Sequence, residues 1–486
     1  MQNLEVLLEK GKRLIVIESL QEAEYLRTLR DISQHSRRLY YTWSSTRGLH
    51  QIPASFDKKP MSNKVEYLFS EILDTERPSV FILLDFHPFI ADHLNIRRIK
   101  DVLNTSEHSS IVLLSPEIEI PEELKFYATN YELPIPSKEE IKKVVYDYAK
   151  NWSREHGKKV KRKGESVLDR LIDNLSGLPF ADMDRLAKNA IYNDGIIDKQ
   201  DIIDVAKEKF KLLNQDSVLH LHLDFESMHN VAGLDNLKQW LERRKPVFSG
   251  DVVLPGEDIP KGALLLGVQG CGKSLAAKAI AACWQVPLLH LDVGSLYNRF
   301  FGQTEENLRD ALQTTEAMEP CILWLDEIEK GLSAVSSNDD VSRRMLGTFL
   351  TWMAEKSTRV FVVATSNDVS ALPPELLRKG RFDEVFFVDL PTEDERQKIL
   401  EIHLSKREIG LEQQEIHEIA KETQGFSGAE LEQLVVSSLY AGHSKDTSVD
   451  VNLLQTEAAA TQPLSVLMAE EVEYLREWAS QRAVKA

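Results

Sequence analysis

The residues with the clearest chemical meaning form the stretch Gly267-Val-Gln-Gly-Cys-Gly-Lys-Ser274, which matches the phosphate-binding pattern G-x-x-x-x-G-K-[ST] at every fixed position. Glycines at these positions let the backbone curl so that its N–H groups point at phosphate oxygens, and the helix that follows adds partial positive charge. In such a loop Lys273 reaches the β- and γ-phosphates, and the Ser274 hydroxyl holds Mg²⁺. The stretch predicts a nucleotide cradle made of Gly267, Val268, Gln269, Gly270, Cys271, Gly272, Lys273, Ser274 and Leu275.

Two acidic residues end an apolar run further along the chain, in Cys321-Ile-Leu-Trp-Leu-Asp-Glu327. We expect Asp326 to hold Mg²⁺ through its water shell and Glu327 to act as the general base that polarises the attacking water. Another apolar run, residues 360–367, ends in Asn367, whose amide can contact the γ-phosphate and position that water. These side chains have the types that phosphoryl transfer to water requires.

Two arginines, Arg378 and Arg381, lie three residues apart beyond the last of these runs. An arginine supplied by a neighbouring subunit can stabilise the charge that develops in the transition state of phosphoryl transfer. The alternative is that both are solvated surface residues. The pair therefore predicts a site that is completed between subunits.

Apolar runs and helix-forming stretches place these residues at one edge of a parallel sheet. Residues 263–266, 287–292, 321–325 and 360–366 are candidates for buried strands, and residues 275–282 form helices well. Because the carboxyl ends of parallel strands meet at one edge, the loop, the acids and the asparagine come together there. We therefore expect a nucleotide-binding α/β core over residues 216–393, followed by a helical lid and a C-terminal helix over residues 394–486.

The N-terminal half has the same order of elements without the phosphate loop. Strand candidates alternate with helical stretches, which predicts an α/β domain over residues 1–150, and a helical segment follows over residues 151–215. After the first strand the chain reads Glu18-Ser-Leu-Gln-Glu22, without glycine or a Lys-Ser pair, and Phe86 follows Asp85 where a catalytic glutamate would stand. Either this half is a degenerate copy of the nucleotide module, or it is an unrelated docking domain. A five-strand core in the order of a nucleotide module, followed by a helical lid, would favour the first.

Composition narrows the classes of function. The 486 residues include 77 acidic and 59 basic side chains, a net charge of −18, which disfavours sequence-independent binding of nucleic acid. The 3 cysteines lack metal-ligand spacing, no apolar run is long enough to span a membrane, and the N-terminus lacks the basic and apolar regions of a signal peptide. These features predict a cytoplasmic protein. The basic run Lys158-Lys-Val-Lys-Arg-Lys163 is interpreted as a solvated linker, with a binding patch as the alternative.

The loop, Asp326-Glu327, Asn367 and Leu376-Leu-Arg-Lys-Gly-Arg-Phe-Asp383 together resemble the AAA branch of the AAA+ ATPases over residues 225–486. The resemblance implies ATP and Mg²⁺ as cofactors, Asn367 as the first sensor, and Arg378 and Arg381 as arginine fingers acting in trans. It also implies that His403, Gly428 and Ala429 line the adenine and ribose side, with Ala232 and Gly233 opposite. Phe300 and Phe301 would grip a threaded polypeptide in a central pore, unless they are ordinary core residues.

The phrases Pro320-Cys-Ile-Leu-Trp-Leu-Asp-Glu-Ile328, Leu372-Pro-Pro-Glu375 and Phe426-Ser-Gly-Ala-Glu430 are similar to an AAA family encoded by a hypothetical open reading frame of algal chloroplast genomes, shared with cyanobacteria and other bacteria. The resemblance implies a hexameric ring that remodels or unfolds a protein partner, without a membrane anchor and in the stroma if plastid-encoded. A nucleotide-dependent switch with low turnover is the alternative, and a DNA-associated loader is less favoured by the charge. Gln303-Thr304 replaces the usual Glu-Ser of the pore loop, which leaves threading open, and no H-E-x-x-H metalloprotease motif occurs.

Overall fold

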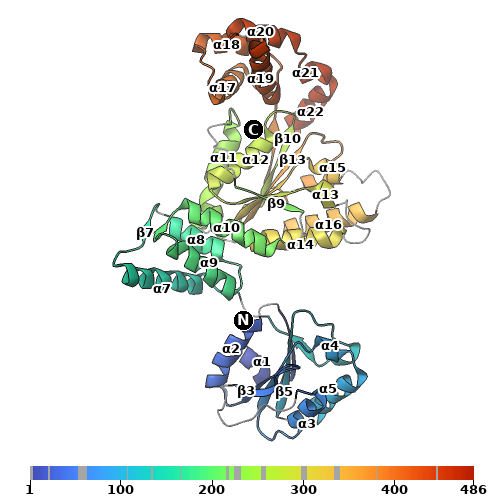
Figure 1. The fold of residues 1–486 in the computed structure, drawn as a ribbon. Helices are drawn as coiled ribbons and strands as arrows, with labels where there is room; N and C mark the ends of the chain where they lie inside the picture. Colours follow the sequence, from blue (N-terminus) through green and yellow to red (C-terminus); the bar gives the residue numbers. More distant parts are fainter. Residues whose placement is uncertain are drawn as a thin grey trace. The chain divides into compact units, whose positions relative to one another are not determined.

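The chain divides into two compact units, Met1–Pro136 with Pro179–Arg185 and Ser137–Leu178 with Leu186–Ala486 (Figure 1). The computed structural model describes residues 4–19, 22–52, 63–106, 108–132, 135–164, 166–214, 218–223, 231–252, 255, 259–296, 304–332, 340–378, 380–444 and 447–486. None of the described helices is both long and apolar enough to cross a membrane.

The first unit is built on a six-stranded sheet in the order β3-β2-β4-β5-β1-β6. All neighbouring strands are parallel except β2 and β3, which are antiparallel. Helices cover both faces (Figure 1), so β4 and β5 are buried along nearly their whole length and consist of continuous apolar or small residues. The strands are β1 (Leu14–Glu18), β2 (Leu39–Ser44), β3 (Gly48–Ile52), β4 (Ser79–Leu84), β5 (Ser109–Ser115) and β6 (Ala128–Asn130).

Alternate residues of the strands enter two apolar cores, one on each face of this sheet. Leu14 and Val16 belong to the core that also contains Trp43, whereas Ile15 and Ile17 belong to the other. The helices of this unit are α1 (Leu4–Glu9), α2 (Glu22–His35), α3 (Val65–Leu73), α4 (His87–Ile90), α5 (His93–Thr105) and α6 (Glu122–Lys125). Apolar side chains of α1 and α2 pack on one face, and those of α3, α4 and α5 on the other.

A helical segment follows, which we call the second domain. It begins with α7 at Lys138, ahead of the boundary expected at residue 150, because Ser137 and Glu140 form a capping box there. The basic run 158–163 is not the linker that the sequence suggested, since Lys161 and Arg162 form β7 and pair with β8. The elements are α7 (Lys138–His156), β7 (Lys161–Arg162), α8 (Val167–Leu175), α9 (Phe180–Tyr192), β8 (Ile196–Ile197) and α10 (Lys199–Leu213).

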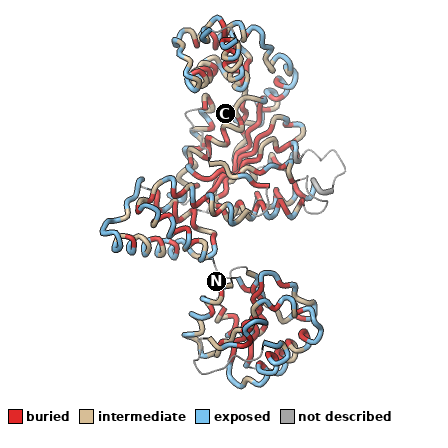
Figure 2. The backbone as a smooth tube through the Cα atoms, viewed as in Figure 1, coloured by how far each residue is buried: buried red, intermediate tan, exposed pale blue. Residues whose placement is uncertain are grey.

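The nucleotide core is a seven-stranded sheet in the order β15-β14-β10-β13-β12-β11-β9, parallel except for β9. Its central strands are red in Figure 2 because helices bury both faces there, whereas the edge strands β9 and β15 are largely not buried. The strands are β9 (Leu219–His222), β10 (Gly262–Gly267), β11 (Leu288–Leu291), β12 (Cys321–Leu325), β13 (Val360–Ser366), β14 (Glu384–Val388) and β15 (Val484–Lys485). The helices are α11 (Asp235–Ser249), α12 (Lys273–Trp284), α13 (Val293–Leu296), α14 (Thr304–Ala317), α15 (Ile328–Leu332) and α16 (Asp340–Glu355), with the 3₁₀ helix η3 (Pro374–Leu377).

The two sheets share one strand order. The five parallel strands β6-β1-β5-β4-β2 correspond in chain order to β14-β10-β13-β12-β11. Each sheet then ends in an antiparallel strand, but β3 follows β2 in the chain whereas β9 precedes β10. A five-strand parallel core followed by a helical segment is what the degenerate-copy hypothesis required of residues 1–215. The mixed α/β fold class is confirmed, and the N-terminal sheet has the strand order of the nucleotide core.

The helical lid folds over the core, and the end of the chain then returns to the sheet. β15 pairs with β14, and Leu475 and Ala479 of α22 enter the apolar core of the sheet. The Arg476 guanidinium also forms a two-pronged ion pair with Asp389, with N–O distances of 2.9 to 3.0 Å. The elements are α17 (Glu393–Lys406), α18 (Gln413–Glu422), α19 (Gly428–Ser444), α20 (Val451–Ala460), α21 (Leu464–Leu467) and α22 (Ala469–Arg482).

Candidate nucleotide site

The phosphate loop joins the end of β10 to the start of α12, and its glycines meet steric demands that no other residue satisfies. Gly267 has a φ of 152°, and a Cβ atom there would lie 2.0 Å from the Val388 carbonyl oxygen. Gly270 has a φ of 78°, and a Cβ atom there would lie 2.9 Å from the Ser427 hydroxyl oxygen of the lid. Gly272 has a φ of 89°, which is also left-handed. A side chain at these positions would be strained or would clash, so the loop keeps its backbone free to face a ligand.

Lys273 lies in this loop with only 6% of its surface exposed. Its ammonium donates hydrogen bonds to the Gly267 and Val268 carbonyl oxygens, at 2.9 and 2.8 Å. Burial lowers the pKa of Lys273 to about 8, because the charged form loses its hydration. Phosphate oxygens would replace the two carbonyl oxygens as acceptors and would compensate the charge directly.

Ser274 and Asp326, the two residues predicted to hold Mg²⁺, are in contact. The Ser274 hydroxyl donates to Asp326 Oδ1 at 3.0 Å, which places two hard oxygen ligands beside the loop. Within the described ranges no group of three or more His, Cys, Asp or Glu side chains could hold a metal ion. Two oxygen donors in contact fit Mg²⁺, which protein sites commonly hold through one or two residues and the phosphates of the nucleotide.

Thr365, on β13, connects both acidic residues and was not identified from the sequence. Its hydroxyl donates to Asp326 Oδ1 and accepts a hydrogen bond from the Glu327 backbone N–H at 3.0 Å. Glu327 has a φ of 49°, a left-handed conformation that is uncommon for glutamate. Thr365 thus satisfies the backbone of the residue that turns the chain out of β12, a role visible only once β12 and β13 are paired.

The Glu327 carboxylate is held from two sides. The Asn367 side-chain amide donates to Oε1 at 2.9 Å, and Lys330 forms an ion pair with Oε2. The neighbouring Glu329 is buried, and it accepts a hydrogen bond from the Asn367 backbone N–H at 3.0 Å. The structure therefore brings the predicted base and the predicted sensor together, and it adds Lys330 and Glu329, which no sequence pattern had singled out.

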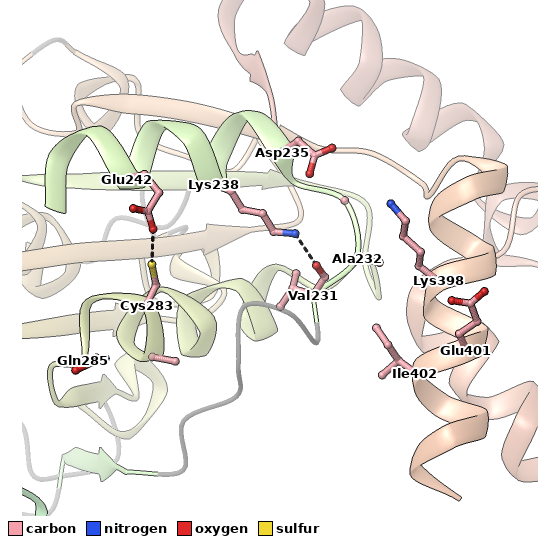
Figure 3. Close-up of a pocket in the computed structure, with 12 residues that line it drawn as sticks. Val231, Ala232, Asp235, Lys238, Glu242, Cys283, Gln285, Lys398, Glu401 and Ile402 are labelled. Atoms are coloured by element: carbon pink, nitrogen blue, oxygen red, sulfur yellow. Dashed lines mark hydrogen bonds between the residues drawn. The ribbon is translucent and has the colours of Figure 1, made fainter. Parts of the chain in front are cut away.

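A cavity of about 690 Å³ opens between α11, the end of α12 and α17 (Figure 3). Ala232 and Gly233, predicted to line the adenine, lie in its wall with Ile402 of the lid. Figure 3 also shows charged side chains around it, and the Lys238 ammonium donates to the Val231 carbonyl oxygen at 2.7 Å. The remaining charged residues, not predicted from the sequence, are Asp235, Glu242, Lys398 and Glu401.

The other lid residues predicted for the adenine side lie elsewhere. The Ala429 backbone N–H donates to the Gly270 carbonyl oxygen at 3.0 Å, so Gly428 and Ala429 lie against the phosphate loop. His403 is next to Ile402 but contacts Glu432, 3.5 Å away, on α19. Burial lowers the pKa of His403, so the charged form of the ring is disfavoured.

Arg378 and Arg381 lie in the segment between η3 and β14. Arg378 is exposed, and Arg381 donates to the Glu375 carbonyl oxygen. Neither forms a hydrogen bond with a described residue of the phosphate loop, Asp326 or Glu327, which leaves both predictions of a role in trans open. Phe300 and Phe301 lie outside the described residues.

Comparisons with known proteins agree with this geometry. Residues 263–390 match the family described as "ATPase family associated with various cellular activities (AAA)". Residues 1–133 match the N-terminal domain of SpoVK-like AAA ATPases, and residues 139–216 match their second domain. The fold and the phosphate loop thus define an AAA ATPase.

Relatives that are similar over nearly the whole chain identify the family within the AAA ATPases more closely. An AAA domain-containing ycf46 protein of Pyropia yezoensis is 34% identical over 98% of this chain and 97% of its own length. The ycf46 protein of Gracilaria tenuistipitata var. liui is 37% identical over 90% of this chain and 89% of its own length. The chain belongs to this ycf46 family of AAA domain-containing proteins, whose members are described as uncharacterised.

More distant matches are confined to part of the chain. The ATP-dependent zinc metalloprotease FtsH of Neorickettsia risticii is 34% identical over 46% of this chain and 37% of its own length. The ADP complex of the FIGL-1 AAA domain matches 57% of this chain and 97% of that domain, with 22% identity and a TM-score of 0.48.

Proposed function

We propose that the chain hydrolyses ATP with Mg²⁺ at the site formed by the phosphate loop, Asp326, Glu327 and Asn367. The observation that supports this most strongly is the hydrogen-bonded set joining Ser274, Asp326, Thr365 and Glu327 at the carboxyl edge of the sheet. Mg²⁺, when bound there with the nucleotide, neutralises charge on the β- and γ-phosphates. The protein's own residues carry the remaining steps.

In this proposal Lys273 leaves the Gly267 and Val268 carbonyl oxygens and binds the phosphates. Glu327 takes a proton from the attacking water, and Asn367 orients that water. Glu327 must first leave Lys330, because an ion-paired carboxylate is a weaker base. The lid follows the state of the phosphate loop because Ala429 is hydrogen-bonded to Gly270.

We further propose that the active form is a ring of subunits, hexameric by family resemblance, that remodels a protein partner. The exposure of Arg378 supports this, since an exposed arginine is available to a neighbouring subunit's nucleotide. Phe300 and Phe301 are the candidates for gripping the partner. The proposed location is the cytoplasm, or the chloroplast stroma for a plastid-encoded chain.

ATP turnover per subunit, measured against protein concentration, tests both parts of the proposal. Wild-type turnover should rise with concentration, and Glu327→Gln should bind ATP without turning it over. Arg378→Ala should lower turnover by about 10³-fold or more if it acts in trans. Near wild-type turnover in Glu327→Gln would refute the assigned base, and turnover independent of both concentration and Arg378 would refute the shared site.

A regulatory switch with little turnover is the second candidate, and the Lys330–Glu327 ion pair favours it. If this pair stays closed, ATP binding changes the lid without hydrolysis. Lys330→Met would then raise turnover several-fold, whereas a ring ATPase whose pair opens on nucleotide binding would show little change. Lys330→Arg, which keeps the charge, is the matched control.

A further inference from the structure

A row of cations follows one face of α7 in the second domain. Lys143, Lys150 and Arg154 are separated by 7 and then 4 residues, with Tyr146 between the first two, and this spacing places them on one side of a helix. All four side chains are exposed, and α7 is largely pale blue in Figure 2. The opposite side packs inward through Ile141, Val145 and Trp152.

The strand β7 adds a cation to the same surface. The guanidinium carbon of Arg162 lies 5.8 Å from the centre of the Tyr146 ring, a cation–π contact that attaches β7 to this face of α7. Pairing of β7 with β8 fixes the strand in place. We call Lys143, Lys150, Arg154 and Arg162 the basic stripe.

The charge of this region is opposite to that of the rest of the chain. Residues 138–163 contain ten basic and four acidic side chains, a net charge of +6, so the remaining residues carry −24 of the total of −18. Among the described residues, no acidic side chain lies within ion-pair distance of the basic stripe. Its charges are therefore exposed to solvent and available to an anionic partner.

We propose that the basic stripe binds a short acidic segment of the protein on which the ring acts. The inference rests on the proposed function, because the segment belongs to the remodelled partner. Unpaired cations on an ordered surface attract carboxylates and orient their approach. From Lys143 to Arg154 the helix rises about 16 Å, which matches about five residues of an extended peptide.

Two observations favour an acidic polypeptide over a nucleic acid. Single-stranded nucleic acids use aromatic faces for stacking, and here the Tyr146 ring has a cation–π contact with Arg162 and the Tyr192 ring one with Lys188. Trp152 is buried and stacks on His156, and Tyr148 lies edge-on to the Tyr192 ring. The excess of negative charge outside the stripe also repels a long polyanion more strongly than a short peptide.

The binding experiment uses the full chain and a fluorescently labelled octapeptide of alternating glutamate and aspartate. The triple variant Lys143→Glu, Lys150→Glu, Arg154→Glu should bind it at least tenfold more weakly. The control, Lys10→Glu, Lys207→Glu, Lys421→Glu, makes the same charge change at exposed lysines elsewhere and should stay within twofold of wild type. ATP turnover should be retained in both, since none of these residues lies at the nucleotide site.

Equal weakening by the control would overturn the proposal, because net charge alone would then explain binding. Stripe-dependent binding of a 20-nucleotide single strand more tightly than the peptide would overturn it in favour of nucleic acid. If the peptide does not bind but turnover is normal, the proposed role of the basic stripe is refuted and the proposed hydrolysis is not. If the peptide binds through the basic stripe but ATP is not turned over, the role of the stripe is supported and the proposed hydrolysis is contradicted.

A second experiment fuses the octapeptide to a folded reporter protein. ATP-dependent unfolding of the reporter should be faster with the peptide than without it, and the triple variant should lose that difference.

Discussion

The two parallel sheets of this chain have the same strand order but different residues where the first strand ends. β10 ends at Gly267 and continues into the phosphate loop, whereas β1 ends at Glu18. Glu18 Oε1 accepts a hydrogen bond from the Ile118 backbone N–H, so its carboxylate links β1 to the segment after β5. The sheet needs only apolar strands between helices, while nucleotide binding needs glycine and lysine at one strand end.

The strands β12 and β4, which occupy corresponding positions in the two sheets, also lead into different residues. β12 leads into Asp326 and Glu327, but β4 leads into Asp85 and then Phe86. Phe86 is fully buried and lies edge-on to Trp43 and Phe69. Where the nucleotide core has Glu327, the proposed general base, the N-terminal sheet has an apolar side chain that contributes to its core.

The helical parts correspond as well. Gly177 precedes α9 and Gly425 precedes α19, and their φ values are 82° and 84°. Four residues after each glycine the chain has an alanine, Ala181 or Ala429. Asp198 and Asp450 cap α10 and α20, the fourth helix of each set. These agreements support the interpretation of residues 1–214 as a degenerate copy of the nucleotide module.

The largest effect should come from exchanging the residues that distinguish the two first strands. Gly267→Glu should abolish ATP binding, because its Cβ would meet the Val388 carbonyl oxygen and its carboxylate would repel phosphate. Lys273→Ala, which leaves the backbone undisturbed, should also remove measurable binding. Glu18→Gly should change nothing, as measured by calorimetry with ATP analogues, and tight binding gained at the N-terminal sheet would contradict the comparison.

Removing the Thr365 hydroxyl should have the next largest effect. Thr365→Val leaves the Glu327 N–H without its acceptor and releases Asp326, so turnover should fall about 10–100-fold, as an unsatisfied polar group costs about 1–3 kcal/mol. ATP affinity should change little, and Thr365→Ser should restore turnover. The matched control is Ser115→Ala at the end of β5, the corresponding strand, and an equal loss there would point to general destabilisation.

Lys273 predicts a pH dependence that the N-terminal sheet lacks. Its pKa is about 8 without nucleotide, and phosphate favours the charged form, so binding above pH 8 requires uptake of a proton. ATP affinity should begin to weaken as the pH rises through 8, and by up to about tenfold per pH unit above it. Calorimetry between pH 7.5 and 9.5 measures this, and a flat profile would show that Lys273 stays charged throughout.

The smallest effect should come from the ion pair that ties α22 to the nucleotide core. The Arg476 side chain is 41% exposed, so solvent screens its pairing with Asp389. Arg476→Ala should lower the free energy of unfolding by about 1 kcal/mol or less. Denaturant unfolding measures this difference, with Arg482→Ala as the control. A loss of several kcal/mol would mean that the contact between α22 and the nucleotide core contributes strongly to the stability of the core.

The sequence indicated the α/β fold and the residues of the phosphate loop because fixed spacing and long apolar runs are local features. β3, β6, β9, β14 and β15 were missed because short strands at or next to a sheet edge form only through pairing with neighbours. Thr365 and Lys330 were missed because their roles depend on contacts across strands or around a turn. The basic run 158–163 was interpreted as a linker because Lys161 and Arg162 pair with β8, 35 residues later, a separation that local patterns do not report.

The number of nucleotides bound per chain tests the central claim most directly. Titration of the full chain with ADP and Mg²⁺ should show one site, and Lys273→Ala should show none. Two sites in the wild type, or one remaining in Lys273→Ala, would mean that the N-terminal sheet binds nucleotide despite Glu18 and would contradict the account.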